Sequence, residues 1–269
     1  MTNKFWSYLC ICIILTTNAL SQNVTDKDNF YNILMLKLGV NDFHIKDERL
    51  SPLIYRGLLF SASVSYNYQR NKYLHEIEFS VSPGKLFCTF NQNQIEEYNG
   101  YVSYSLLYQI YKKELSNSNF DFNVGTGIES YMSWTHTRNP NVFLSSGEYS
   151  WYWSHSVPII LDGRYNINYK HCINLQISSP LIRLVSRPDY SQNQRYYEIQ
   201  YNPQKAALYG DIEFLWSDFV FFTKLSYDFK LSNHFDFNLS YRFNFASTHK
   251  TELMRLYTNN LLIGTGWKF

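Results

Sequence analysis

Charge is scarce in this 269-residue chain: 17% of the residues are charged, and the formal net charge is +2 at pH 7. So small a net charge favours neither a nucleic-acid partner nor an acidic one. No phosphate-binding glycine loop is present. The seven histidines are dispersed, and none has a metal-ligand spacing to Asp or Glu that exceeds chance. We therefore expect no cofactor and no metal.

Long hydrophobic runs are missing as well. The one marked apolar run, Tyr8 to Leu15, is shorter than the ~20 residues that a membrane-spanning helix needs. Lys4 precedes it, and Ala19-Leu-Ser21 fits the small residues before a signal-peptidase cleavage site. The sequence predicts a signal peptide at residues 1–21, with an uncleaved anchor as the alternative, followed by a single domain at residues 22–269.

Aromatic residues, in contrast, are abundant at 19%, with 24 tyrosines and 20 phenylalanines. The stretch from His234 to Phe245 shows how they are arranged, because its odd positions are apolar from Phe235 onward and its even positions are polar. Successive side chains of an extended strand point to opposite faces. This stretch therefore predicts a strand with one aromatic face and one polar face.

The same alternation recurs along the mature chain. Strands are expected near residues 30–40, 53–69, 73–87, 102–110, 120–132, 151–169, 173–177, 219–230, 234–245 and 256–269. Ten is an even number, as closed bacterial barrels have, although 8 or 12 strands remain possible. The prediction is an all-β fold, a transmembrane antiparallel up-and-down β-barrel. Pro158 suggests a bulge in its strand or a later start of that strand.

The connections between these strands alternate in length. Those at residues 70–72, 170–171 and 231–233 are short, whereas those at 91–99, 135–150, 186–210 and 247–255 are longer. Short periplasmic turns and long outer loops are the rule for outer-membrane barrels, which places both termini in the periplasm. Cys88 and Cys172, the two cysteines after the signal peptide, then lie at opposite ends of the barrel. A disulfide between them is excluded by distance.

The end of the chain, Gly266-Trp-Lys-Phe269, carries a resemblance to a known class. With the alternating strands before it, the sequence resembles a small single-chain outer-membrane β-barrel protein of Gram-negative bacteria. Ala-Leu-Ser before Gln22, together with many Asn, Tyr and Lys residues, looks like a Bacteroidetes-type member. The resemblance implies an outer-membrane location among membrane lipid and lipopolysaccharide. It also implies that Trp267 and Phe269 form an assembly signal for the barrel-assembly machinery.

The polar face carries a set of charged residues that should point into the lumen. These are Glu76, Glu78, Asp121, Glu129, Asp162, Arg164, Lys224, Asp228, Lys230, Asp236 and Arg242. The favoured interpretation is a network of ion pairs that fills a narrow barrel, because charges buried there must be paired or hydrated. A selective pore is the alternative, although open channels need about sixteen strands.

A search for catalytic residues finds little. Outer-membrane lipid-processing enzymes carry a His-x-Ser pair on one strand face, but Ser154-His155-Ser156 puts His155 on the opposite face from both serines. His136, Asp189 and Glu198 are loop residues that could converge as in an outer-membrane protease.

Three functional hypotheses follow. The leading one is a non-enzymatic barrel with a structural or surface-binding role through its outer loops, notably the Tyr-rich residues 190–201. A narrow channel for ions or small solutes is the second. A lipid- or peptide-processing enzyme is the third. The sequence does not identify an extracellular ligand.

Overall fold

The computed structural model describes residues 31–48, 51–88, 94–137, 149–187, 210–214, 219–248 and 253–269. The signal peptide expected at residues 1–21 lies outside them. The strands are β1 (Tyr31–Asp47), β2 (Ser51–Arg70), β3 (Tyr73–Cys88), β4 (Gln94–Glu114), β5 (Asn119–Thr137), β6 (Tyr149–Asn166), β7 (His171–Ser186), β8 (Asp211–Phe214), β9 (Val220–Lys230), β10 (Phe235–Thr248) and β11 (Met254–Lys268). No helix in these ranges is long and apolar enough to cross a membrane.

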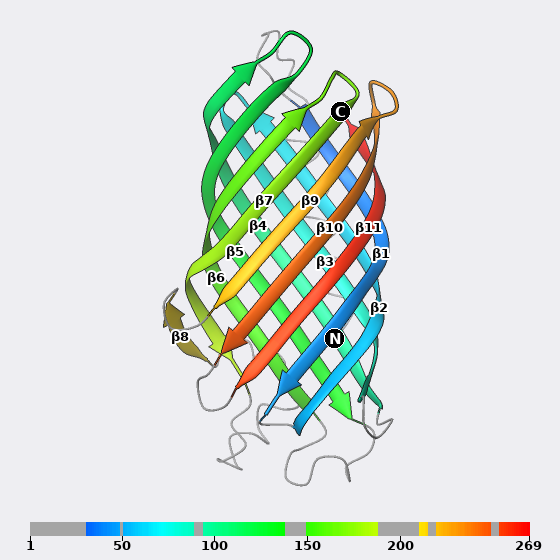
Figure 1. The fold of residues 1–269 in the computed structure, drawn as a ribbon, viewed down its shortest axis with the longest axis vertical. Coiled ribbons are helices and arrows are strands. Elements are labelled where there is room, and N and C mark those ends of the chain that lie inside the picture. The colour runs from blue at the N-terminus through cyan, green and yellow to red at the C-terminus, as the bar shows by residue number, and fades with distance from the viewer. Residues whose placement is uncertain are drawn as a thin grey trace, which may run out of the picture.

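Ten of these strands form a closed antiparallel barrel (Figure 1). Each strand pairs with the next along the chain, and β1 pairs with β11 to close the ring. Strand β7 pairs with β9 over its first half and with the short strand β8 near its end. The prediction of a ten-strand barrel is therefore confirmed, with β8 as an addition at one end.

The two ends of the barrel differ. At one end, which we call the short-turn end, lie the turns at residues 71–72, 115–118, 167–170 and 231–234, together with the start of β1 and the end of β11 (Figure 1, top). Asn71 in the first turn has a φ of 55°, a left-handed conformation that Asn tolerates better than most residues. The strand ends that the longer connections join lie at the opposite end, which we call the loop end. This arrangement agrees with the alternation of connection lengths in the sequence.

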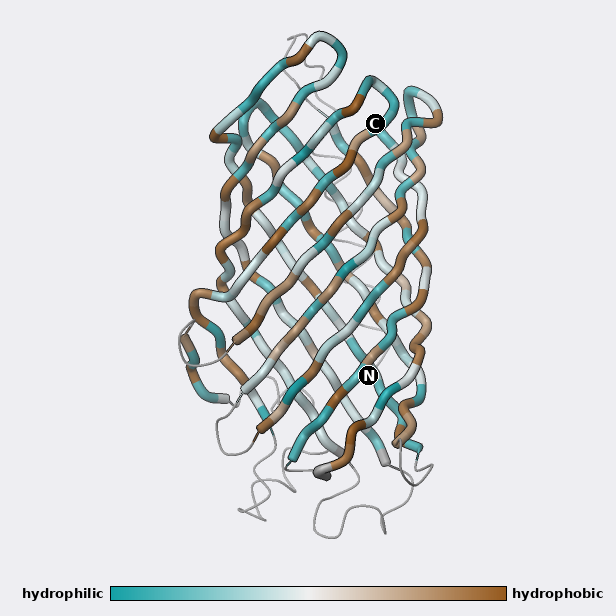
Figure 2. The backbone as a smooth tube through the Cα atoms, in the orientation of Figure 1, coloured by the Kyte–Doolittle hydropathy of each residue, from teal (hydrophilic) through white to brown (hydrophobic). Residues whose placement is uncertain are grey.

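Hydrophobic and hydrophilic residues alternate along the strands (Figure 2), and the exposure of the side chains shows which face each takes. In β10, Phe235 is 52% exposed on the outer face, whereas Asn238 is 2% exposed on the inner face. Leu261, Ile263 and Trp267 of β11 are likewise exposed on the outside. An apolar outer face around a polar inner face is the arrangement of transmembrane barrels.

Several strands are longer than the sequence suggested. Strand β1 continues beyond Val40 to Asp47, and β7 continues beyond Ile177 to Ser186. Residues 94–99, expected in a loop, begin β4. Their polar sequence can form a strand because Glu97 points inward, where its carboxylate accepts hydrogen bonds from Ser133 at 2.7 Å and Thr135 at 2.8 Å. The loop expected at residues 135–150 is also shorter than predicted, because β5 extends to Thr137 and β6 begins at Tyr149.

A bulge is present at Pro158, but the extra residue, Leu181, lies in the neighbouring strand β7 and not in the strand of Pro158, which begins at Tyr149. The register between β6 and β7 shifts at Val157 and Pro158, and Pro158 faces Pro180 across the ladder. Leu181 and Ile182 are both exposed although they are neighbours, which is what one extra residue in a strand produces. Thr126 donates a hydrogen bond to the Pro158 carbonyl at 2.7 Å. A bulge therefore allows two prolines in a closed sheet.

The terminal aromatic residues lie on the outer face of β11. Trp267 and Phe269 are 49% and 46% exposed, and their ring centroids are 5.0 Å apart. The backbone nitrogen of Phe269 donates a hydrogen bond to the Asn32 carbonyl at 3.3 Å, which attaches the chain end to β1. Their role as an assembly signal stays a prediction.

We predict that Phe237→Arg destabilises the barrel more than Asn238→Arg. An arginine on the outer face costs about 2–4 kcal/mol at the bilayer midplane and less toward the interface, and Phe237 lies three residues past the turn at residues 231–234. Asn238 faces inward and hydrogen-bonds Asp228 at 2.6 Å, so an arginine there meets a carboxylate. Unfolding titrations in lipid vesicles measure both changes, and Asn238→Ala measures the loss of the amide alone. Equal losses for the two arginine variants would show that the inner and outer faces are assigned wrongly.

Candidate functional site

The lumen contains three layers between the short-turn end and the loop end. We call them the vestibule, the ion-pair layer and the apolar core. The vestibule is a cavity of about 480 Å³ that extends from Lys112 and Lys268, near the short turns, to Lys37 and Lys224, deeper in the barrel. A cavity of this volume is in the range of small-molecule sites.

Most charges of the vestibule have partners across neighbouring strands. Asp162 accepts hydrogen bonds from Asn123 and Asn174, both at 2.6 Å, and lies 3.5 Å from Arg164. Arg164 donates a hydrogen bond to the Tyr31 hydroxyl at 2.5 Å. These contacts fix the side chains of β5, β6 and β7 around one carboxylate.

The opposite wall of the vestibule is similar. Asp236 forms an ion pair with Lys268 at 2.5 Å, and Lys230 lies opposite Asp236 in the register of β9 and β10. Asp228 accepts a hydrogen bond from Asn238, and Asp121 accepts one from Gln109 at 2.8 Å. The vestibule is thus lined by charges of both signs and by amides.

The ion-pair layer bridges the lumen at its middle. Glu78 of β3 contacts Arg242 of β10 and lies 3.1 Å from Lys224 of β9, which also contacts Glu76. Strand β3 neighbours neither β9 nor β10 in the sheet, so these ion pairs cross the barrel. Arg242 also lies over the Tyr101 ring, 4.8 Å from its centroid. A void of about 20 Å³ remains among these side chains, which is room for about one water molecule.

Glu129 belongs to the same layer. Its carboxylate accepts a hydrogen bond from Ser178 at 3.2 Å, and its side chain is buried. All eleven charged positions expected to face the lumen therefore lie on the inner face, and the structure divides them between the vestibule and the ion-pair layer.

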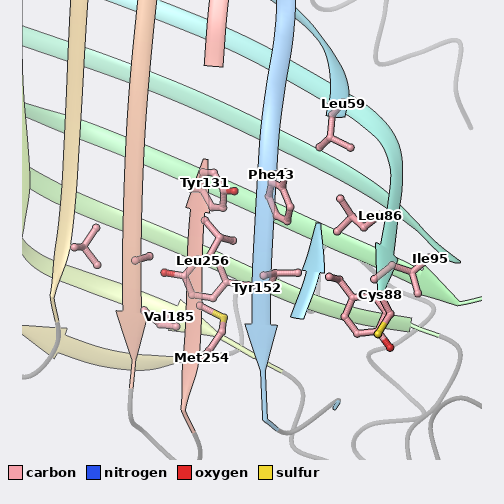
Figure 3. Packing of buried hydrophobic residues seen from close by; sticks show 14 residues of the cluster. Phe43, Leu59, Leu86, Cys88, Ile95, Tyr131, Tyr152, Val185, Met254 and Leu256 are labelled. Atoms are coloured by element: carbon pink, nitrogen blue, oxygen red, sulfur yellow. The ribbon is translucent and has the colours of Figure 1, made fainter. Parts of the chain in front are cut away.

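The apolar core fills the lumen toward the loop end (Figure 3). Phe43, Leu86 and Met254 are fully buried there, on three different strands, and Leu59 and Leu256 are almost fully buried. The expectation of a polar inner face along the whole barrel is therefore wrong at this end. Here inward apolar side chains from opposite walls pack against each other and exclude water. The inward positions of these strand segments are therefore apolar, although the sequence pattern predicts polar residues there.

Further ion pairs lie at the loop end. Arg183 forms an ion pair with Glu213 of β8 at 2.6 Å, and Arg187 forms one with Asp47 at 2.6 Å. The sequence does not point to these residues because most of them fall in segments predicted as loops or interruptions. It does not point to Lys37 either, which is buried on the inner face of β1, because the irregular pattern of that strand does not assign its faces.

The candidate catalytic residues do not form a site. Ser154 and Ser156 point inward, whereas His155 points outward and hydrogen-bonds Ser130 at 2.9 Å. His136 lies 3.5 Å from Glu96, on the outer face of β4 and β5. Asp189 and Glu198 lie outside the described residues. Within the described ranges, no group of three or more His, Cys, Asp or Glu residues could hold a metal ion.

Cys88 and Cys172 are free thiols at opposite ends of the barrel, as the sequence predicted. Cys88 is buried in the apolar core, and Cys172 lines the vestibule. The distance between these layers excludes a disulfide.

Comparison with known proteins gives no family model and no curated protein that matches the sequence. Solved structures do match. The outer-membrane protease OmpT from Escherichia coli has a TM-score of 0.52 at 8% identity, over 92% of this chain and 99% of that chain. Neisserial surface protein A has a TM-score of 0.41 at 9% identity, over 89% of this chain and 97% of its own. The attachment invasion locus protein Ail of Yersinia pestis has a TM-score of 0.34 at 10% identity, over 88% and 99%.

The chain has the fold of a bacterial outer-membrane β-barrel. Identities this low show the fold alone.

We predict that Glu78→Gln lowers the free energy of unfolding by about 3 kcal/mol. This is the low end of the range for breaking a buried ion pair, because the amide oxygen of Gln can still accept a hydrogen bond. Urea titration in lipid vesicles measures the change. The matched control is Glu114→Gln, which breaks an exposed pair with Lys112 near the short-turn end and should leave stability unchanged. A Glu78→Gln variant as stable as this control would mean that the cross-lumen pairs do not stabilise the barrel.

Proposed function

We propose that this protein is an integral outer-membrane barrel with a closed lumen, which acts as a structural or surface-binding protein through the connections at its loop end. The observation that carries the proposal is the filling of the lumen. Two successive layers, the ion-pair layer and the apolar core, occupy its cross-section between the vestibule and the loop end.

The outer face supports a location in the membrane. Large apolar side chains are exposed all around the barrel, from Leu36 and Leu38 on β1 to Leu261 and Ile263 on β11. Such a surface is incompatible with water but suited to lipid. The expected signal peptide at residues 1–21 and the terminal Phe269 agree with an outer-membrane route. The fold shared with OmpT, an outer-membrane protein, agrees as well.

The loop end is the side available for contact with other molecules. In the outer membrane the short-turn end faces the periplasm, so the loop end faces outward. The Tyr-rich stretch at residues 190–201 belongs to the connection between β7 and β8 and lies outside the described residues. Tyrosine, asparagine and glutamine side chains suit contact with proteins and glycans. Deletion of this stretch should abolish surface binding while the barrel still assembles.

The two other hypotheses receive less support. A channel needs a continuous aqueous path, and the cross-lumen ion pairs and the apolar core lie across it. The enzymatic hypothesis included His136, but this residue and Glu96 lie on the outer face of the wall and do not point into the lumen.

We predict that the refolded protein inserts into planar lipid bilayers without conductance steps at any applied voltage. The ion-pair layer and the apolar core leave no hydrated path for ions. A general porin measured in the same bilayers is the positive control, and protease-resistant, heat-modifiable bands on gels confirm that the sample is folded. Reproducible single-channel steps from folded protein would contradict the closed lumen and favour the channel hypothesis.

A further inference from the structure

Lys37 occupies an unusual position in the vestibule. It lies on the inner face of β1 with 3% of its surface exposed, and it lines the vestibule near the ion-pair layer. In the part of the chain that the structure describes, it has no hydrogen bond and no ion pair. A lysine is almost never this buried without a partner. Its ammonium group therefore needs an interaction that these residues do not supply.

The wall of the barrel makes room for this side chain. Gly264 of β11 lies directly opposite Lys37 in the register. A Cβ atom at position 264 would lie 2.2 Å from the Leu36 carbonyl oxygen, 2.7 Å from the Lys37 Cγ and 2.8 Å from its Cα, which is too close for any side chain. Glycine at this position therefore lets the two strands approach closely and leaves room for the Lys37 stem against the wall.

Among the described residues, no carboxylate forms an ion pair with Lys37. The charged groups that act on it most strongly are Lys224, Arg242, Glu76 and Glu78. Both carboxylates already contact Lys224 or Arg242, as described above. Glu76 and Glu78 are therefore engaged with other cations, and Lys37 forms no ion pair with either of them. An uncompensated charge in the interior is unfavourable, so an anion is the complementary ligand.

Acceptor atoms without partners lie in the same cavity. The side-chain oxygens Asn67 Oδ1, Asn238 Oδ1 and Asp236 Oδ1 are buried and have no hydrogen-bond donor among the described residues. The Asn238 side-chain nitrogen donates a hydrogen bond to Asp228, which fixes the orientation of the Asn238 amide. The Asn238 oxygen then remains free to accept a hydrogen bond from another donor. Each of these three oxygens can accept a hydrogen bond. A ligand that carries several hydroxyl groups can donate those hydrogen bonds.

We propose that the vestibule binds a small hydroxylated anion, a solute of the acidic-sugar class, with its carboxylate or phosphate group on Lys37 and its hydroxyls on Asn67 and Asn238. The cavity of about 480 Å³ accommodates a ligand of this size. Water can satisfy the free oxygens, but it does not neutralise the charge of Lys37. The vestibule lies at the short-turn end, so the ligand enters from the side opposite the outer connections. Binding of this ligand in the vestibule is independent of the surface-binding role proposed for the connections at the loop end.

The test is calorimetric titration of the full mature chain, refolded in detergent at low salt, with five probes. Glucuronate and glucose 6-phosphate carry both an anionic group and hydroxyls, glucose carries hydroxyls only, and acetate and inorganic phosphate carry charge only. We expect the two acidic sugars to bind more tightly than the other three. A preference for one acidic sugar over the other identifies the anionic group.

Lys37→Met keeps the length of the side chain and removes the charge. It should weaken glucuronate binding about tenfold or more, as expected for a charge-assisted hydrogen bond, and leave any binding of glucose unchanged. The matched control is Lys112→Met, which removes a lysine that lines the same cavity but is paired with Glu114. It should bind glucuronate as the native protein does.

A second variant covers the outcome in which Lys37→Met does not fold. Asn67→Ala removes one free acceptor and should weaken glucuronate and glucose 6-phosphate but not acetate. The proposal is overturned if no acidic sugar binds at millimolar concentration. It is also overturned if both lysine variants lose affinity equally, because general attraction would then explain the binding, or if neither Lys37→Met nor Asn67→Ala changes it.

Discussion

Every feature of this protein depends on the pairing of β1 with β11. In a lipid environment an unpaired backbone group has no water to bond, so a sheet must close on itself. The ladder from Ile33 opposite Lys268 to Asp47 opposite Met254 supplies that closure. Once the ring is closed, each residue faces either outward or into a narrow lumen. The apolar outer face and the crowded interior are both consequences of this single constraint.

The interior then follows from what a narrow closed ring can hold. Charges at its middle are tolerated because Glu76 and Glu78 reach cations on the opposite wall. Toward the loop end, inward residues such as Phe43 and Met254 pack against each other and need no partner. Near the short turns the lumen remains hollow, and most charged side chains are paired along the wall. Among the described residues, Lys37, Asp121 and Asp228 line this hollow without an ion pair.

The sequence predicted the parts of the fold that depend on alternation. Phe235 to Phe245 alternate strictly, and β10 has the faces that this pattern indicates. An irregularity at Pro158 could be predicted because proline cannot donate to a ladder, although the extra residue lies in the neighbouring strand β7. Residues 94–99 could not be predicted as a strand, because Glu97 is satisfied by Ser133 and Thr135 of another strand. Alternation within one segment carries no information about partners across the barrel. The apolar core and the isolation of Lys37 were missed for the same reason.

The most direct test of this divided interior is the reaction of single cysteines with a charged, water-soluble thiol reagent. Ser226→Cys lines the vestibule and Ser61→Cys is fully buried beyond the ion-pair layer, each in a chain whose native Cys88 and Cys172 are replaced by serine. In folded protein the cysteine at 226 should react and the cysteine at 61 should not, although both react after unfolding. Equal rates at the two positions in the folded barrel would reveal an aqueous path through the lumen and contradict the closed interior.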